Sequence, residues 1–108
     1  MNGTERISGY LGLAARGRML ESGEFSVEKA VRSGRAKLVV VASDASDNTK
    51  HKFHSLCEVY KVPCIELLTR ESLGHLIGRE FRASCALTDR NLSDAVIRII
   101  EQECSKGR

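Results

Sequence analysis

The apolar positions of this chain predict helices that alternate with short strands from one end to the other. The clearest strand is Leu38 to Ala42, an unbroken apolar run that is β-branched in its middle. The run is too short for a helix and suits a strand that other elements cover on both faces. Ser43 and Asp44 end it with side chains that favour turns. We expect the chain to be organised around this buried strand.

A short amphipathic helix precedes that strand. Val27, Ala30 and Val31 share one helical face after Gly23, and Gly34 closes the helix because glycine readily takes the left-handed conformation of helix ends. A helix that begins at a glycine exposes unpaired backbone N–H groups in its first turn, and such groups favour anions such as phosphate. The sequence therefore indicates an anion-binding position at Gly23.

The other predicted helices have recognisable first and last residues. Thr4 is the expected cap of a first helix that ends at Gly17. A third helix is expected between residues 46 and 61, because Ser46, Asp47 and Asn48 offer cap side chains and Val62-Pro63 breaks the helical pattern. Its buried side is expected to carry Thr49, Phe53, Leu56, Cys57 and Tyr60. Further helices are expected from Thr69 to Gly78 and from Asp89 onward.

Three more strands are expected, at residues 19–22, 64–68 and 82–88. The polar tail, Ser105 to Arg108, is expected to fray. Because helices alternate with strands, they must cover both faces of a central sheet. The pattern thus predicts an α/β fold, a three-layer α-β-α sandwich with three or four strands, and the 108 residues suit a single domain, 1–108.

Charge adds a possible partner to this picture. The net charge is +3, which suits an RNA partner without requiring one. Basic residues form one group in the first third of the chain and a second group later: Arg16, Arg18, Lys29, Arg32, Arg35 and Lys37, then Arg79 and Arg82. If the fold brings the two groups together around Gly23, they form a phosphate-binding patch; otherwise they are dispersed, solvated charges.

Composition argues against a membrane protein or a secreted one. No apolar run approaches the roughly 20 residues that a membrane span needs, and the first residues lack the basic-then-apolar design of a signal peptide. The 4 cysteines form no C-x-x-C pair, and Cys57, Cys64 and Cys85 lie within apolar patterns, where they act as small buried hydrophobes. A reducing cytoplasm is the expected setting.

The chain offers little for catalysis. His51, His54 and Cys57 have spacing that would place them on adjoining helical turns, as in a metal site, but Cys57 belongs to the apolar stripe. His75 fits a surface position, and turn or capping roles account for Asp44 and Asp47. Without a nucleophile–base set or a phosphate loop, we expect no enzyme activity, no cofactor and no metal.

An ordered set of residues resembles the signature of the L7Ae ribosomal-protein family, which binds RNA kink-turns. The set runs over nearly the whole chain, about residues 7–100, and consists of Gly23, Lys29, Ala30, Gly34-x-Ala36-Lys37-Leu38-Val39, Ala42-x-Asp44, Leu56-Cys57-Glu58, Val62-Pro63, Leu73-Gly74 and Gly78. Its local pattern most resembles the small bacterial members of the YlxQ type. The resemblance implies an α-β-α sandwich on a mixed, four-stranded sheet.

The resemblance also implies a site. In the family, RNA is held by the start of the helix after the glycine, by nearby strand ends and by the loop before the final strand. Transferred to this chain, Gly23 lets the RNA backbone come close, Lys29 reaches the RNA, and Leu73-Gly74 packs behind the loop that carries Glu80. The implied RNA-binding residues are Gly23, Glu24, Phe25, Ser26, Lys29, Lys37, Asp44, Arg79, Glu80, Phe81 and Arg82.

Two positions depart from the family pattern. The family usually has an amide–acid pair, such as Asn-Glu, where this chain has Phe25 and Ser26, and that pair recognises the edges of sheared G·A base pairs. Three interpretations of Phe25 stay open: a place in the core, stacking on a base, or packing at the helix entry. Arg82 stands where the family has a proline.

Two functions of different kinds follow. The first is a cytoplasmic RNA-binding protein that recognises a kink-turn or related structured RNA, in the ribosome or in RNA metabolism. The alternative is a protein–protein adaptor, because the same fold also serves that role. The two differ in their response to salt, since phosphate binding weakens steeply as salt rises and an apolar interface does not.

Overall fold

The computed structural model describes residues 2–106. Within them, helices and strands alternate: α1 (Gly3–Arg16), β1 (Leu20–Ser22), α2 (Glu24–Arg32), β2 (Leu38–Val41), α3 (Asp47–Tyr60), β3 (Cys64–Glu66), α4 (Arg70–Leu76), β4 (Ser84–Leu87) and α5 (Arg90–Lys106). The predicted alternation of five helices with four strands is thus confirmed for this part of the chain.

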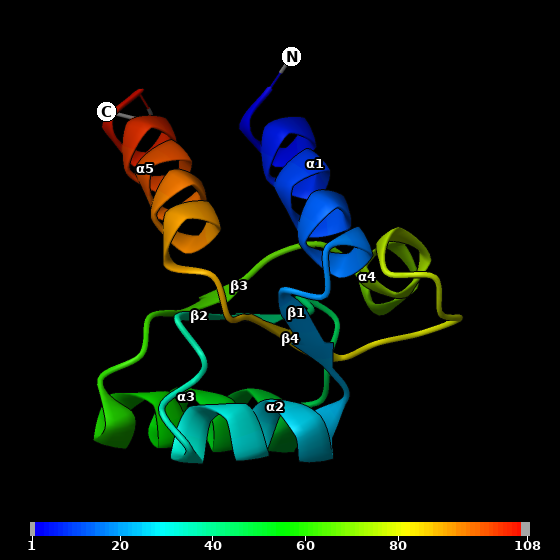
Figure 1. Cartoon of the computed structure of the whole chain (residues 1–108), viewed down its shortest axis with the longest axis vertical. Coiled ribbons are helices and arrows are strands. Elements are labelled where there is room, and N and C mark those ends of the chain that lie inside the picture. The colour runs from blue at the N-terminus through cyan, green and yellow to red at the C-terminus, as the bar shows by residue number, and fades with distance from the viewer. Residues whose placement is uncertain (1, 107–108) are drawn as a thin grey trace.

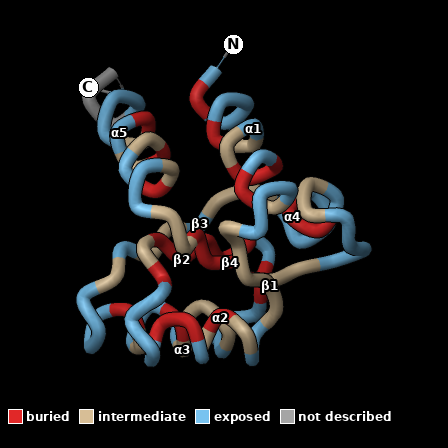
Figure 2. The backbone as a smooth tube through the Cα atoms, in the orientation of Figure 1, coloured by how far each residue is buried: buried red, intermediate tan, exposed pale blue. Residues whose placement is uncertain are grey.

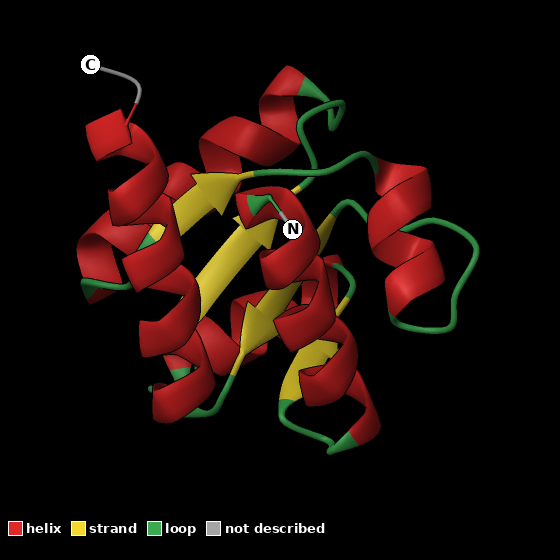
Figure 3. Cartoon of the chain, turned by 90° about the horizontal axis from the view of Figure 1, so that it is seen from above, coloured by secondary structure: helices red, strands yellow, loops and turns green. Residues whose placement is uncertain are grey.

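The four strands form one mixed sheet in the order β1-β4-β2-β3, seen from above in Figure 3. β2 runs parallel to β3 and antiparallel to β4, and β1 pairs antiparallel with the other edge of β4. All four residues of β2 are buried, as are those of β4, because each of these strands has a neighbour on both edges and helices on both faces. The predicted mixed four-stranded sheet is confirmed.

Helices cover the sheet on both faces. Figure 1 shows α1, α4 and α5 on one side of the sheet and α2 with α3 on the other. The side chains of β2 alternate between the layers: Val39 and Val41 join the core under α2 and α3, while Leu38 and Val40 join the core under α1, α4 and α5. Figure 2 shows the resulting burial at the level of the sheet. The three-layer α-β-α sandwich is confirmed.

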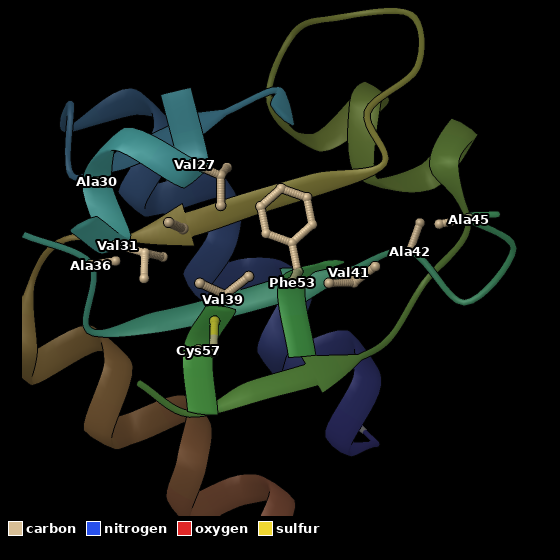
Figure 4. Close-up of a cluster of buried hydrophobic side chains, with 11 residues drawn as sticks. Val27, Ala30, Val31, Ala36, Val39, Val41, Ala42, Ala45, Phe53 and Cys57 are labelled. Atoms are coloured by element: carbon tan, nitrogen blue, oxygen red, sulfur yellow. The ribbon is translucent and has the colours of Figure 1, made fainter. Parts of the chain in front are cut away.

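The core between the sheet and the α2–α3 layer centres on Phe53. Its ring lies among Val27 of α2 and Val39 and Val41 of β2, with Cys57 one turn further along α3 (Figure 4). Each of these five residues is at most 1% exposed to solvent. Truncating a ring in such a position typically costs about 3–5 kcal/mol. This core fixes the position of α2 relative to the sheet.

Local capping matches the predictions at two helices and differs at a third. Ser46 accepts a hydrogen bond from the Thr49 N–H at 3.2 Å and Thr69 accepts one from the Ser72 N–H at 3.1 Å, as expected for N-caps. The first helix, however, is capped by Asn2, whose Oδ1 accepts from the Glu5 N–H at 2.8 Å, so the prediction of Thr4 was wrong. The amide oxygen of Asn2 accepts a hydrogen bond as a threonine hydroxyl would, and because Asn2 lies two residues earlier, the helix begins at Gly3.

The strands are shorter than predicted. β3 ends at Glu66 because Leu68 takes the left-handed conformation (φ 65°), and β4 begins only at Ser84. The last helix continues to Lys106, and residues 107–108 of the tail that was expected to fray lie outside the described part. Tyr60 is 40% exposed and was wrongly predicted on the buried side of α3.

The register defines two ends of the sheet. Ser22, Val41, Glu66 and Ser84 lie at one end, which we name the Gly23 end because α2 begins there. The opposite end is marked by Leu20, Leu38, Cys64 and Leu87, and we name it the Lys37 end after the residue that precedes β2. In Figure 1 the Lys37 end lies on the left of the sheet, where the loops from α2 and α3 rise to β2 and β3.

Candidate nucleic-acid interface

The backbone of Gly23 makes the turn from β1 into α2. Its N–H donates to Ser84 O at 3.2 Å and its carbonyl accepts from the Val27 N–H at 3.0 Å. The conformation, φ 92° and ψ 150°, belongs to a region that only glycine adopts readily. Gly23 has no side chain with which to cap α2, so the N–H groups of the first turn remain available to an anion.

The guanidinium of Arg82 lies directly beside this turn. Arg82 Nε donates to Ser22 Oγ at 3.1 Å, and it is also 4.0 Å from the position that a Cβ on Gly23 would take. A second nitrogen of the same group donates to Phe81 O at 3.0 Å. The structure therefore brings a positive charge from the loop before β4 to the open start of α2.

Asp44 and Arg70 extend the same surface toward β2. The Asp44 carboxylate accepts from the backbone N–H of Arg70 at 2.8 Å, and Arg70 Nε approaches the same oxygen at 3.7 Å. The carbonyl of Arg70 in turn accepts from the Arg82 N–H at 3.0 Å. Asp44, Arg70, Arg82 and Ser22 are thus linked in one chain of hydrogen bonds along the Gly23 end.

The loop between α4 and β4 rests on a glycine. A Cβ on Gly74 would lie 2.6 Å from Glu80 O, and Arg79 donates its N–H to Gly74 O at 2.7 Å. Leu73 beside it is fully buried in the core under α1 and α5. The predicted packing of Leu73-Gly74 behind this loop is confirmed, and it leaves Arg79, Glu80 and Phe81 on the surface.

The outer face of α2 carries an aromatic ring in solvent. Phe25 is 80% exposed, so a place in the core is ruled out for it. It lines a shallow hollow together with Glu28, Lys29 and Arg32, which lie one and two turns along the helix. Phe81 in the loop is also exposed, at 58%. The elements that meet at the Gly23 end thus carry two exposed aromatic rings, and such rings stack on unpaired bases of RNA.

A sequence profile of the ribosomal protein L7Ae/L30e/S12e/Gadd45 family matches residues 5–97. The chain belongs to this family. It is 43% identical over 91 residues to the RNA-binding protein YlxQ of Bacillus subtilis, a match that covers 84% of this chain and 91% of that protein. It is 30% identical to the large ribosomal subunit protein eL8 of Thermoplasma volcanium, with 82% of this chain and 78% of that protein covered.

Solved structures agree with this membership. A protein of unknown function from Bacillus halodurans superposes with a TM-score of 0.84 at 37% identity, covering 91% of this chain and 98% of that one. A 15.5kD RNA binding protein of Giardia lamblia superposes with a TM-score of 0.76 at 21% identity, covering 93% and 86% respectively, and shares the fold. The family resemblance expected from the sequence is confirmed.

The basic residues of this chain do not all gather at one end of the sheet. The prediction of a single patch around Gly23 was wrong for Lys37, because Lys37 precedes β2 and Asp44 follows it, at opposite ends of that strand. Arg16 and Arg18 are also far from Gly23, since the neighbouring Met19 carbonyl accepts from Thr88 beyond the other end of β4. Strand direction divides the cations into two groups, one at each end of the sheet.

Glu24 and Glu28 face α3 and hold it to α2. Lys52 Nζ lies 2.8 Å from a Glu28 oxygen and 3.8 Å from a Glu24 oxygen, and Arg32 Nε lies 3.0 Å from the other Glu28 oxygen. The hydrogen bond from Lys52, followed by that from Arg32, lowers the pKa of Glu28 below 4.5. The Glu28 carboxylate is therefore neutralised within the α2–α3 layer, whereas Glu24, which directly follows Gly23, is paired more loosely with the same lysine.

The histidines and cysteines have other partners. His54 Nε2 lies 2.9 Å from a Glu66 oxygen on the exposed side of α3. Cys57 of the same helix is buried against the sheet, so the two side chains do not point to a common metal position. Among the residues searched within the described chain, no three His, Cys, Asp or Glu side chains are placed to hold a metal ion. Burial raises the pKa of the Cys85 thiol to about 12.

No helix in the described residues is long and apolar enough to span a membrane.

Two residues of this surface were missed by sequence reasoning. Ser22 holds the Arg82 guanidinium, and Arg70 joins Asp44 to the loop before β4. Each partner lies more than 20 residues away in the chain, so no local spacing connects them. Only the sheet register, which places the ends of β1, β2 and β4 together, brings them into contact.

Proposed function

We propose that this chain acts as one RNA-binding domain and that the Gly23 end is its RNA-binding surface. The observation that carries the proposal is the position of Arg82, whose guanidinium lies beside the uncapped start of α2. Backbone N–H groups and an arginine fork together suit a phosphate of an RNA backbone. The absence of a side chain on Gly23 allows that backbone to come close.

The identity of the relatives supports the same conclusion. The protein of Bacillus subtilis to which the chain is 43% identical is named an RNA-binding protein. We extend that activity to this chain and propose a kink-turn, or a structured RNA of similar shape, as its target. The setting would be the cytoplasm, with the ribosome or RNA metabolism as the process that uses it.

The side chains on the outer face suggest how this RNA is read. Lys29, one turn beyond Phe25, is exposed and supplies a charge for a base edge or a phosphate. Phe25 is in solvent and cannot hydrogen-bond to a sheared G·A pair, but its ring can stack on an unpaired base. We therefore propose that recognition depends more on shape and stacking here than in relatives with an amide–acid pair.

A binding titration over a range of salt concentrations tests the proposal. The RNAs are one kink-turn and a duplex of the same length without the bulge. We expect tighter binding to the kink-turn, with an affinity that falls as salt rises because phosphate contacts release counterions. Equal affinity for both RNAs would contradict a structured target, and no binding to either would favour the protein–protein adaptor.

A further inference from the structure

A cleft lies at the Lys37 end of the sheet, at the other end of β2 from the Gly23 turn. Its volume is about 450 Å³, which is within the range of small-ligand sites. Its lining residues come from the ends of α2 and α3 and the starts of β2, β3 and α5, segments that lie on the left of the sheet in Figure 1. Its polar walls are supplied by Arg32, Lys37, Tyr60, Lys61, Arg90 and Asp94.

Positive charge dominates this cleft. Arg32 is neutralised by Glu28 at 3.0 Å, but Lys37, Lys61 and Arg90 have no carboxylate within ion-pair distance among the described residues. The Lys37 ammonium donates to the Gly34 carbonyl at 3.2 Å, which holds it at the end of α2. Three cations thus face one acidic side chain, that of Asp94, and such an excess attracts anions.

Lys61 occupies a backbone position that favours another residue. It ends α3 in the left-handed conformation, with φ 61° and ψ 42°. Glycine is the usual residue there because it has no Cβ to crowd the backbone. The chain instead carries a lysine here, and its side chain lines the cleft.

Tyr60 adds a surface suited to a nucleotide. Arg32 lies beside the ring, with its guanidinium carbon 6.0 Å from the ring centroid and one nitrogen 3.5 Å from the phenol oxygen. Val62, Pro63 and Ile97 supply apolar contacts nearby. A cleft with unpaired cations at one part and an aromatic ring at another matches a phosphate joined to a sugar and a base.

We propose that the cleft at the Lys37 end binds a nucleotide phosphate, with Lys37, Lys61 and Arg90 around the phosphate and Tyr60 beside the base. A free nucleotide and a second RNA segment both present such a phosphate, and the test below distinguishes them. The site is separate from the Gly23 end because Lys37 and Asp44 lie at opposite ends of β2, although Arg32 borders both this cleft and the hollow beside Phe25 and Lys29.

Amide NMR titrations of the whole chain test this site. The two probes are adenosine monophosphate and a single-stranded RNA of about a dozen nucleotides. We expect the backbone signals of Lys61, Val62 and Arg90 to shift. Shifts with both probes identify the free nucleotide as a sufficient ligand, and shifts with the RNA alone identify a second RNA segment; either result supports the site. Shifts with neither probe overturn it.

Variants separate binding from helix stability. Lys61→Gly relieves the left-handed strain, so its unfolding temperature should be unchanged or higher, while its affinity for the bound probe should fall roughly fivefold. Arg90→Gln should weaken binding similarly. Arg6→Gln removes the same charge from an exposed position on α1 and should change little. Equal losses in all three variants would mean diffuse attraction and would overturn the site. Lys29→Ala should leave these shifts intact, whatever its effect at the Gly23 end.

Discussion

Arg82 Nε lies 3.1 Å from Ser22 Oγ, although the two residues are 60 positions apart. The bond joins the last residue of β1 to the loop before β4, directly beside the start of α2. The two segments that form the proposed RNA surface are therefore held together before any RNA binds, which lowers the cost of ordering them on binding.

Removing either member of this pair should have unequal effects on RNA affinity. Arg82→Ala removes both the charge and the anchor, so we expect a loss of about 1–3 kcal/mol in kink-turn binding. Ser22→Ala keeps the charge but releases the guanidinium, so its loss should be smaller. Fluorescence titrations at one salt concentration measure both. A larger effect from Ser22→Ala would contradict a direct role for Arg82.

Gly23→Ala tests the backbone at the start of α2. A Cβ there meets only Arg82 Nε at 4.0 Å, so space is available and the cost comes from the positive φ of 92°. We expect the free energy of unfolding to fall by about 1–3 kcal/mol in urea denaturation.

Gly9→Ala is the matched control for that substitution. Gly9 lies within α1, where a Cβ meets nothing within 4 Å, so the same added methyl group should raise the free energy of unfolding by about 0.5–1 kcal/mol. If both alanines stabilised the protein, Gly23 would not be conformationally special.

Glu28 should make the free energy of unfolding depend on pH in the acidic range. Its folded pKa lies below 4.5 because Lys52 and Arg32 donate to it, so its contribution is present above that value and is lost as pH falls through the folded pKa. Glu28→Gln should therefore lower the urea midpoint near pH 7, and the difference from the unmodified protein should shrink toward pH 3. A difference that grows on acidification would contradict this role.

Substitutions at Phe25 and Ser26 test how the proposed surface recognises a kink-turn. Neither side chain replaces the hydrogen bonds of an amide–acid pair, and each base edge left without a partner costs about 1–3 kcal/mol. Phe25→Asn combined with Ser26→Glu should therefore raise affinity for a kink-turn and make it depend on the G·A pairs. The control RNA has those pairs replaced. Tight, G·A-dependent binding by the unmodified protein would show that Phe25 is no obstacle.

Sequence patterns were sufficient for the elements but not for their limits. Ser46 and Thr69 were identifiable as caps because a cap is a contact between a side chain and a backbone N–H three residues away. The end of β3 was not identifiable, because Ile65 and Leu67 look alike in sequence while the turn at Leu68 decides where pairing stops. Local contacts can be read from spacing, whereas strand limits depend on neighbours.

The candidate site was predictable only in part. Gly23 was proposed from its place before an amphipathic helix, and Arg82 from the second group of basic residues, at a position where the family has a proline. Lys37 was placed wrongly: it is only eight positions after Lys29 in the sequence, but between them the chain passes through the end of α2 and a turn to the other end of the sheet. Nearness in sequence predicts nearness in space only within one element.

The most direct test of the RNA surface compares Lys29→Ala with Arg6→Ala in binding titrations against one kink-turn RNA. Both residues are exposed cations, but Lys29 lies on α2 and Arg6 on α1, across the sheet. The proposed surface predicts that Lys29→Ala weakens binding by about 1–3 kcal/mol and that Arg6→Ala changes it little. Equal losses from the two variants would contradict a defined RNA site at the Gly23 end.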